Sequence, residues 1–257
     1  MARVPLPPGF LRLPLAHRAL HDRAAGVIEN SPAAIRAAIA AGYGIEIDLQ
    51  LSRDGEAMVF HDDGLDRLTA ATGPVSALSA AGLTALTLRG SEDRIPTLAE
   101  VLDLVSGRVP LLIELKDQTL AMSETDGRLE AATARLLADY RGEVAVMSFN
   151  PHSVAHMARL APSVPRGLTT SAWDPDEWAP LDPATCARLR EIPDYASSES
   201  SFISHEAADL PRPRVAELKA EGAAVLCWTI RSPADEACAR RIADNITFEG
   251  YAAPIPA

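Results

Sequence analysis

Strand-like and helix-like segments alternate along almost the whole chain, and this alternation is the feature that most restricts its fold. Residues 44–51 read GIEIDLQL, and their period-two alternation of apolar and polar residues predicts a strand. The alanine-rich segment 32–41 predicts a helix, with Ser31 as N-cap, Pro32 at the first helical position and Gly42 after the end. Roughly eight strand-then-helix units of this kind follow one another, and such regular alternation predicts a parallel sheet.

About eight units in 257 residues fit a (β/α)8 (TIM) barrel of the α/β class better than an open sheet. A doubly wound fold is the alternative, although the chain has neither a GxGxxG nor a Walker loop to support nucleotide binding. We expect a single domain over residues 1–257, with an irregular segment at 62–95 forming a small insertion after the second strand. The predicted strands lie at 13–16, 44–51, 57–61, 110–116, 144–149, 165–170, 202–204, 224–230 and 245–248.

Composition narrows the choice of partners and compartment. The formal net charge of −11 disfavours nucleic acid and anionic membrane surfaces as partners, although a few local cations can still bind a small anion. The three cysteines form no CxxC pair and their number is odd, so a disulfide framework is not expected and a reducing compartment is the simplest interpretation. No apolar window has the length of a membrane span. We therefore expect a cytoplasmic protein without stable membrane insertion.

A carboxylate pair on one strand predicts a metal site. Glu46 and Asp48 are two residues apart on the strand, so both point to the same face. Glu114 lies in the next long strand with the same alternation, and three converging carboxylates inside a barrel require a cation. An all-oxygen set favours Mg²⁺ or Ca²⁺, with Mn²⁺ also possible. The alternative is a set of buried ion pairs with Arg18 or Lys116 and no metal.

Two histidines follow strands beside this cluster. His17 ends the first predicted strand and His61 ends the extension of the second, and barrel active sites are built where strands end. Histidines in this position predict a general acid and base pair, although a structural role for both is the alternative. Arg18 and Lys116 supply positive charge that suits a phosphate oxyanion. His205 also follows a strand and could line the same pocket.

Several short motifs are shared with one enzyme family. They are His17-Arg18, Glu29-Asn30-Ser31, Glu46-Ile47-Asp48-Leu49, Asp54-Gly55, His61-Asp62, Leu65-Asp66-Arg67, Glu114-Leu115-Lys116, Ser148-Phe149 and Cys227-Trp228-Thr229. In this order the set resembles the glycerophosphodiester phosphodiesterases, over nearly the whole chain and most densely from about residue 17 to 70. The chain departs from the family pattern at Ala19, Ser31 and Leu68, where glycine, threonine and threonine are usual.

The resemblance implies a barrel hydrolase with a small insertion after the second strand, acting on a small glycerophosphodiester to give glycerol phosphate and an alcohol. The implied roles are metal binding for Glu46, Asp48 and Glu114, acid–base catalysis for His17 and His61, and substrate binding for Arg18, Lys116 and Trp228. It does not say which histidine is the acid, which metal is physiological or which alcohol leaves. The oligomeric state and the effect of Ala19 also stay open.

Two other functions are compatible with the same residues. A related phospholipase D-like barrel would cleave lysophospholipids or phospholipids, and it would need a broad apolar lip around the pocket. Phe149, Trp173 and Trp178 could form such a lip or could pack against one another. A binding or regulatory protein with a catalytically inactive barrel is the alternative from another class.

Overall fold

The computed structural model describes residues 3–256, and its strands close into a barrel. Eight strands run parallel in the order β1-β9-β8-β7-β6-β5-β4-β2, and pairing of β1 with β2 closes the circle. This closure confirms the predicted (β/α)8 fold and excludes the doubly wound sheet. The strands are β1 Leu15–Ala16, β2 Gly44–Leu51, β3 Ala57–Val59, β4 Leu111–Leu115, β5 Val144–Ser148, β6 Arg166–Thr170, β7 Phe202–Glu206, β8 Ala224–Ile230 and β9 Asn245–Phe248. The additional strand β3 pairs antiparallel with β2.

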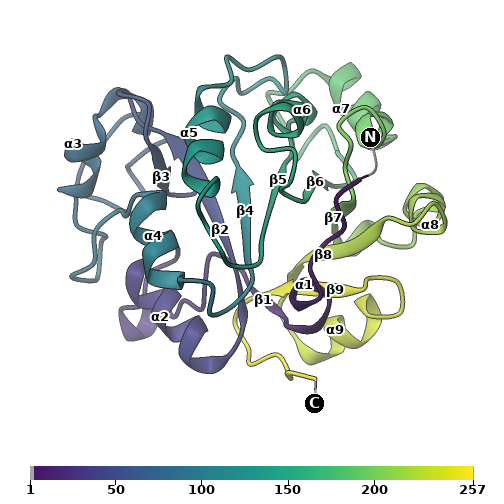
Figure 1. The fold of residues 1–257 in the computed structure, drawn as a ribbon, viewed down its shortest axis with the longest axis horizontal. Helices are drawn as coiled ribbons and strands as arrows, with labels where there is room; N and C mark the ends of the chain where they lie inside the picture. Colours follow the sequence, from purple (N-terminus) through teal and green to yellow (C-terminus); the bar gives the residue numbers. More distant parts are fainter. Residues whose placement is uncertain (1–2, 257) are drawn as a thin grey trace.

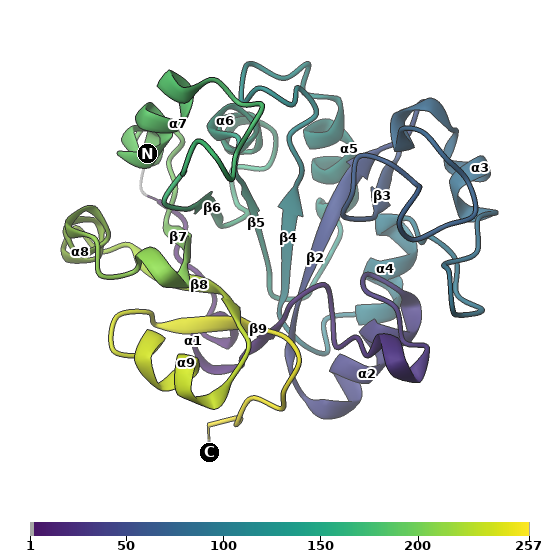
Figure 2. The ribbon, with the colours of Figure 1, turned by 180° about the vertical axis from the view of Figure 1, so that it is seen from behind.

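Helices surround the barrel on its outer side (Figure 1), and the view from behind shows the same arrangement (Figure 2). The helices are α1 Gly9–Arg12, α2 Pro32–Ala41, α3 Ala80–Thr84, α4 Leu98–Val105, α5 Arg128–Leu137, α6 Pro151–Leu160, α7 Pro183–Arg190, α8 Pro213–Ala220 and α9 Pro233–Ala239. The helix α1 contributes Phe10 to the barrel interior. The punctuation predicted for α2 is confirmed. The Ser31 hydroxyl accepts from the Ala34 amide, and Gly42 ends the helix with a left-handed φ of 79°.

The period-two pattern of each strand separates an outer core from the barrel interior. On β2, Ile45 and Ile47 face outward into the main hydrophobic core, whereas Glu46 and Asp48 lie on the opposite, inner face. Apolar residues fill the interior below the carboxylates; they include Phe10, Leu15, Leu112, Ala145, Met147, Phe202 and Leu226. The barrel is therefore a packed core, and its polar side chains are placed where the strands end.

The segment 62–95 lies outside the barrel on the side of β3 (Figure 1). It has an apolar cluster of its own, which includes Leu65, Leu68 and Leu83 together with Phe60. Leu68, the departure from the family pattern, is a member of this cluster and is 2% exposed. The sequence predicted an irregular segment here, and the structure adds the short helix α3, whose five residues are too few to give a helical period.

The structure bears on two features considered in the sequence, membrane-spanning helices and disulfide bonds. Among residues 3–256, none of the helices has both the length and the apolar character required to cross a bilayer. All three cysteine thiols are free, with Cys186 and Cys227 buried and Cys238 exposed. Cys227 belongs to the main hydrophobic core.

Candidate active site

The residues predicted for the site come together around one cavity at the carboxyl ends of the strands. The cavity has a volume of about 160 Å³. Seven of the eight predicted residues line it, namely His17, Arg18, Glu46, His61, Glu114, Lys116 and Trp228. The eighth, Asp48, is buried beside them and contacts Lys116. The structure therefore brings together residues that are up to 211 positions apart in the sequence, from Trp228 back to His17.

Three buried carboxylates lie together at the cavity, two of them in its lining and Asp48 beside them. Glu46 and Asp48 point inward from β2, and Asp48 lies in register with Glu114 on β4. One oxygen from each of the three carboxylates lies within 4.8 Å of the others. The Lys116 ammonium lies 2.7 Å from Asp48 Oδ1 and 2.6 Å from Glu114 Oε1. The ion pairs that were the alternative to a metal are thus present for Lys116, and they leave Glu46 without a side-chain cation.

The electrostatics of this cluster show what it could hold. Burial, with the charges of Asp48 and Glu114, raises the pKa of Glu46 well above its usual value. Burial alone would also raise the pKa of Asp48, but Lys116 and other nearby cations hold it below the usual value. Three carboxylates exceed the positive charge that Lys116 and Arg18 supply. Hard oxygen donors with an excess of buried negative charge fit a divalent cation of the Mg²⁺ or Ca²⁺ type.

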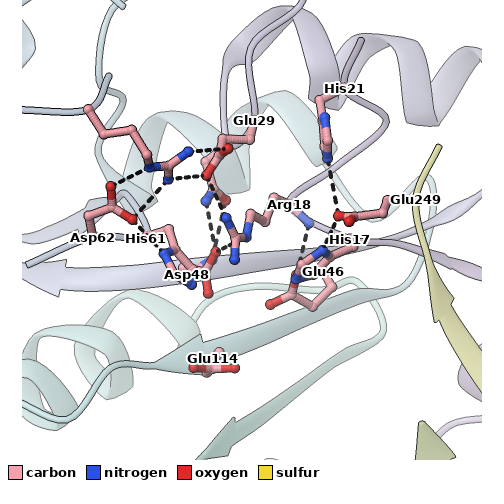
Figure 3. A network of polar contacts seen from close by, with 12 residues as sticks. His17, Arg18, His21, Glu29, Glu46, Asp48, His61, Asp62, Glu114 and Glu249 are labelled. Carbon is pink, nitrogen blue, oxygen red and sulfur yellow. Dashed lines mark hydrogen bonds and ion pairs between the residues drawn. The ribbon is translucent and has the colours of Figure 1, made fainter. Parts of the chain in front are cut away.

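His17 is held by an acidic residue that the sequence analysis did not identify. Its Nδ1 lies 2.6 Å from Glu249 Oε2, directly after β9 (Figure 3). Glu249 also accepts from Arg231 Nε at 2.8 Å, and His21 Nε2 lies 3.6 Å away. Burial lowers the pKa of His17, although the bond to Glu249 opposes this. The rule that active-site residues follow barrel strands could have found Glu249, because the strand 245–248 was predicted.

His61 lies at the end of a chain of ion pairs that returns to Arg18 (Figure 3). His61 Nδ1 lies 2.7 Å from Asp62 Oδ1, and Arg67 donates to both Asp62 oxygens at 2.6 and 2.9 Å. Arg67 also donates to both oxygens of Glu29, whose Oε1 accepts from Arg18 Nη1 at 2.8 Å. Burial opposes ionisation of Glu29, but the two arginines lower its pKa to about 2. This network joins the segments that carry the two histidines.

The turn after His17 has an unusual backbone. Arg18 and Ala19 have positive φ angles of 52° and 64°. In this conformation the Arg18 amide donates to Glu46 Oε2 at 2.9 Å, and the Ala19 amide donates to the Glu46 carbonyl at 2.9 Å. Glycine adopts a left-handed conformation without strain, so the glycine usual in the family has a physical reason here. Asn30, quoted in a motif but given no role, donates from Nδ2 to Asp48 Oδ2 at 2.9 Å.

Aromatic side chains form one wall of the cavity. Phe149 and Trp228 line it, with their ring centroids 5.5 Å apart. Trp178 packs on Phe149 at 5.0 Å and on Trp173 at 4.1 Å. Trp173 is only 2% exposed, so it packs behind this wall. The aromatic residues singled out in the sequence therefore do gather, and Phe149 is the one among them that reaches the cavity.

The suggestion that His205 lines the pocket is wrong. Its Nδ1 lies 2.7 Å from Thr170 Oγ1, and the side chain is completely buried. It shares its register with Cys227, which belongs to the outer core, so its side chain faces away from the barrel interior. The sequence could place His205 near a strand end, but the strand was predicted to stop at 204 and extends to Glu206.

Comparison with known proteins shows the family to which the chain belongs and several of its relatives. The family model described as the glycerophosphoryl diester phosphodiesterase family matches residues 17–247. A glycerophosphodiester phosphodiesterase of Caldanaerobacter subterraneus is 31% identical over 164 residues, which cover 61% of this chain and 65% of the relative. A Bacillus subtilis enzyme of the same name is 29% identical over 59% of this chain and 56% of its own length. The chain thus spans less than two thirds of either relative.

Solved structures share the whole barrel. A phosphodiesterase of Oleispira antarctica, solved in complex with the product sn-glycerol-3-phosphate, is 25% identical with a TM-score of 0.71, covering 92% of this chain and 93% of that one. A glycerophosphodiester phosphodiesterase of Thermotoga maritima has a TM-score of 0.68 over 91% of this chain and 92% of its own. The second match is 19% identical and speaks for the fold alone.

Proposed function

Because the chain belongs to the glycerophosphoryl diester phosphodiesterase family, we propose that it hydrolyses a glycerophosphodiester to glycerol phosphate and an alcohol. The observation that carries this proposal is the convergence of three carboxylates, two histidines and two positively charged side chains, Arg18 and Lys116, at one cavity. A phosphodiester needs positive charge for its oxygens, a base for the nucleophile and an acid for the departing alcohol. The cavity supplies each of these from named residues.

We assign the metal site to Glu46, Asp48 and Glu114, with Mg²⁺ or Ca²⁺ as the cation and Mn²⁺ as a further possibility. When bound, such a cation polarises the phosphodiester and lowers the pKa of the attacking oxygen. Arg18 and Lys116 line the same cavity and hold the phosphate oxygens by charge-assisted hydrogen bonds. Their own pairing with carboxylates keeps both side chains directed at the cavity.

The two histidines move the protons. Each has its Nδ1 against a carboxylate, His17 against Glu249 and His61 against Asp62, which leaves Nε2 as the atom available to substrate. A carboxylate on Nδ1 fixes the ring orientation and the tautomer, as in other hydrolases. One histidine accepts the proton of the nucleophile, and the other donates to the departing alcohol. The lowered pKa of His17 supports the first role for it, because a neutral ring accepts a proton.

The aromatic wall receives the rest of the substrate. Trp228 and Phe149 line the cavity, and the Trp228 ring is held by a hydrogen bond from Nε1 to the Ser204 carbonyl at 3.0 Å. We propose a small molecule as the substrate of this single barrel domain. The three free thiols support a cytoplasmic site of action.

A turnover assay with matched histidine variants tests the proposal. The wild-type protein should release glycerol phosphate from glycerophosphodiesters with choline, ethanolamine, glycerol or inositol head groups. Replacement of His17 or His61 by alanine should lower the rate by at least about 10²-fold, the lower end expected for loss of a general acid or base. His152→Ala is the control, because His152 lies on α6 and does not line the cavity.

Two outcomes would count against parts of this account. Near wild-type turnover in His17→Ala or His61→Ala would remove that residue from the mechanism. Preferential turnover of a lysophospholipid over every glycerophosphodiester in the screen would move the chain to the alternative substrate class.

A further inference from the structure

Two buried threonines line the cavity from strands other than those that carry the carboxylates. Thr169 lies on β6 and Thr247 lies on β9, and each is 2% exposed. Both face the barrel interior. Thr169 is in register with Ser204, which lies on the same face of β7 as the interior residue Phe202, and Thr247 is in register with the interior residue Leu15 on β1. Among residues 3–256, neither hydroxyl has a hydrogen-bond partner.

These two threonines differ from the other buried threonines of the described chain. Thr69 and Thr133 donate to the carbonyls of residues four positions earlier, and Thr170 bonds to His205. The two that lack a partner are thus the two that line the cavity. A buried hydroxyl without a partner costs about 1–3 kcal/mol, whereas valine would fill the same space without that cost. The hydroxyls of Thr169 and Thr247 therefore indicate a ligand that forms hydrogen bonds with them.

The distribution of charge around the cavity indicates which part of a ligand this is. The charged groups Arg18, Glu46, Glu114 and Lys116 come from the segments around β1, β2 and β4. The segments β5, β6, β8 and β9 contribute the uncharged side chains of Met147, Phe149 and Trp228 along with the two threonines. Arg231, which also lines the cavity from the segment after β8, is 64% exposed and is paired with Glu249. A phosphate group belongs beside Arg18 and Lys116, and an uncharged group with hydroxyls belongs beside the two buried threonines.

We propose that Thr169 and Thr247 form a hydroxyl-binding subsite that recognises the polyol half of the substrate. The proposal rests on the proposed function for the position of the phosphate, and it adds the group that selects glycerol over an unsubstituted alkyl chain. Each threonine Oγ donates to one ligand hydroxyl and can accept from another. Two hydroxyls of the glycerol moiety would thereby satisfy two buried polar groups that the protein itself leaves unpaired.

Calorimetric binding of two phosphate esters, with the same divalent cation present throughout, tests the subsite without turnover. The probes are sn-glycerol 3-phosphate and propyl phosphate, which share the phosphate and the three-carbon chain and differ in two hydroxyls. The wild-type protein should prefer the glycerol ester by about tenfold or more, as expected for two net hydrogen bonds. Thr169→Val/Thr247→Val should bind both esters equally, with its affinity for propyl phosphate unchanged.

Two further variants separate recognition from folding. Thr169→Ser/Thr247→Ser keeps both hydroxyls and should keep the preference. Ser153→Ala removes another buried hydroxyl without a partner, on α6 and away from the cavity, and should behave as wild type. The single valine variants should each lose part of the preference, which gives a result even if the double variant does not fold.

The possible failures are distinguishable. Equal binding of both esters by the wild-type protein, or an undiminished preference in the valine variants, would overturn the subsite and leave the proposed function standing. An equal loss of affinity for both esters in the valine variants would show a structural role and would also overturn it. Binding of neither ester by the wild-type protein would overturn the proposed function and the subsite together.

Discussion

Ala19 carries a conformational strain that glycine would not. Its φ of 64° is left-handed, and its side chain is 1% exposed within the main core. A left-handed conformation costs an ordinary residue about 1–2 kcal/mol, so the buried methyl group and the strained backbone act in opposite directions. The departure from the family glycine is therefore tolerated, because the rest of the turn is fixed by hydrogen bonds to Glu46.

Ala19→Gly should be nearly neutral for folding, within about 0.5 kcal/mol, because relief of strain offsets the lost burial and the added freedom of the unfolded chain. Ala34→Gly is the matched control, since Ala34 is equally buried but lies in the right-handed helix α2. There no strain is relieved, and a loss of at least about 1 kcal/mol is expected. Urea unfolding of both variants measures the difference, and equal losses would contradict the strain.

The sequence allowed prediction of those site residues that belong to a strand pattern or to a motif. Glu46 and Asp48 follow from the period of one strand, and His17 and His61 follow from strand ends. Thr247 could not be singled out, because a threonine within a strand has no distinguishing pattern. The role proposed for Thr247 rests on its missing hydrogen-bond partner, which only the three-dimensional structure shows.

At the scale of elements, an ion network ties the loop after β1 to the segment after β3. Glu29 precedes α2, and Arg67 lies within the segment 62–95, yet two hydrogen bonds of 2.7 and 2.8 Å join them. Arg18 and Asp62 extend the network at its two ends, and Asp62 holds His61. The position of His61 relative to Arg18 therefore depends on a side chain that does not touch the cavity.

Glu29→Gln should destabilise the protein in a manner that depends on pH. The pKa of Glu29 is about 2 in the folded protein, below its ordinary value of 4.5. Its ionised form therefore contributes stability that is fully present above pH 4.5 and is lost as the pH falls toward 2. We expect the wild type to exceed the variant by about 1 kcal/mol or more at pH 7, and this gap to narrow between pH 4.5 and 2.

Urea unfolding at several pH values measures the gap for Glu29→Gln. The control is Glu56→Gln, because Glu56 pairs with Arg135 at 3.0 Å on the exposed surface, where an ion pair is worth at most about 1 kcal/mol. A gap for Glu29→Gln that stays constant across the pH range would contradict an origin in the ionised carboxylate.

Most helices and strands were predictable because their ends carry chemical signals. The helix α4 begins with a complete capping box of Thr97 and Glu100, a pattern that can be read in the sequence. The segment 57–61 was predicted as a strand, and β3 ends at Val59. Phe60 still donates its amide to the Asp48 carbonyl, and His61 then turns to the cavity, which no period in the sequence can show. The helix α1 was not predicted because, like α3, it is too short to show a helical period in the sequence.

At the scale of the whole molecule, the net negative charge of the protein opposes the binding of an anionic substrate. A net charge of −11 repels an anionic phosphodiester, and three of the acidic groups lie at the cavity. Arg18 and Lys116 line the cavity and offset part of this negative charge, and the proposed metal ion would offset more of it. The fold places strands distant in sequence around a single axis, so that the carboxylates of β2 and β4 lie close enough together to bind the one metal ion proposed above.

The measurement that tests the central claim most directly is the release of glycerol phosphate from glycerophosphocholine by the metal-depleted protein, before and after addition of Mg²⁺ or Ca²⁺. We expect no release in the presence of chelator and full recovery with one of the two cations, and no recovery in Glu46→Gln or Glu114→Gln. Undiminished release in chelator would contradict the metal site, and the absence of release under every metal would contradict the hydrolysis itself.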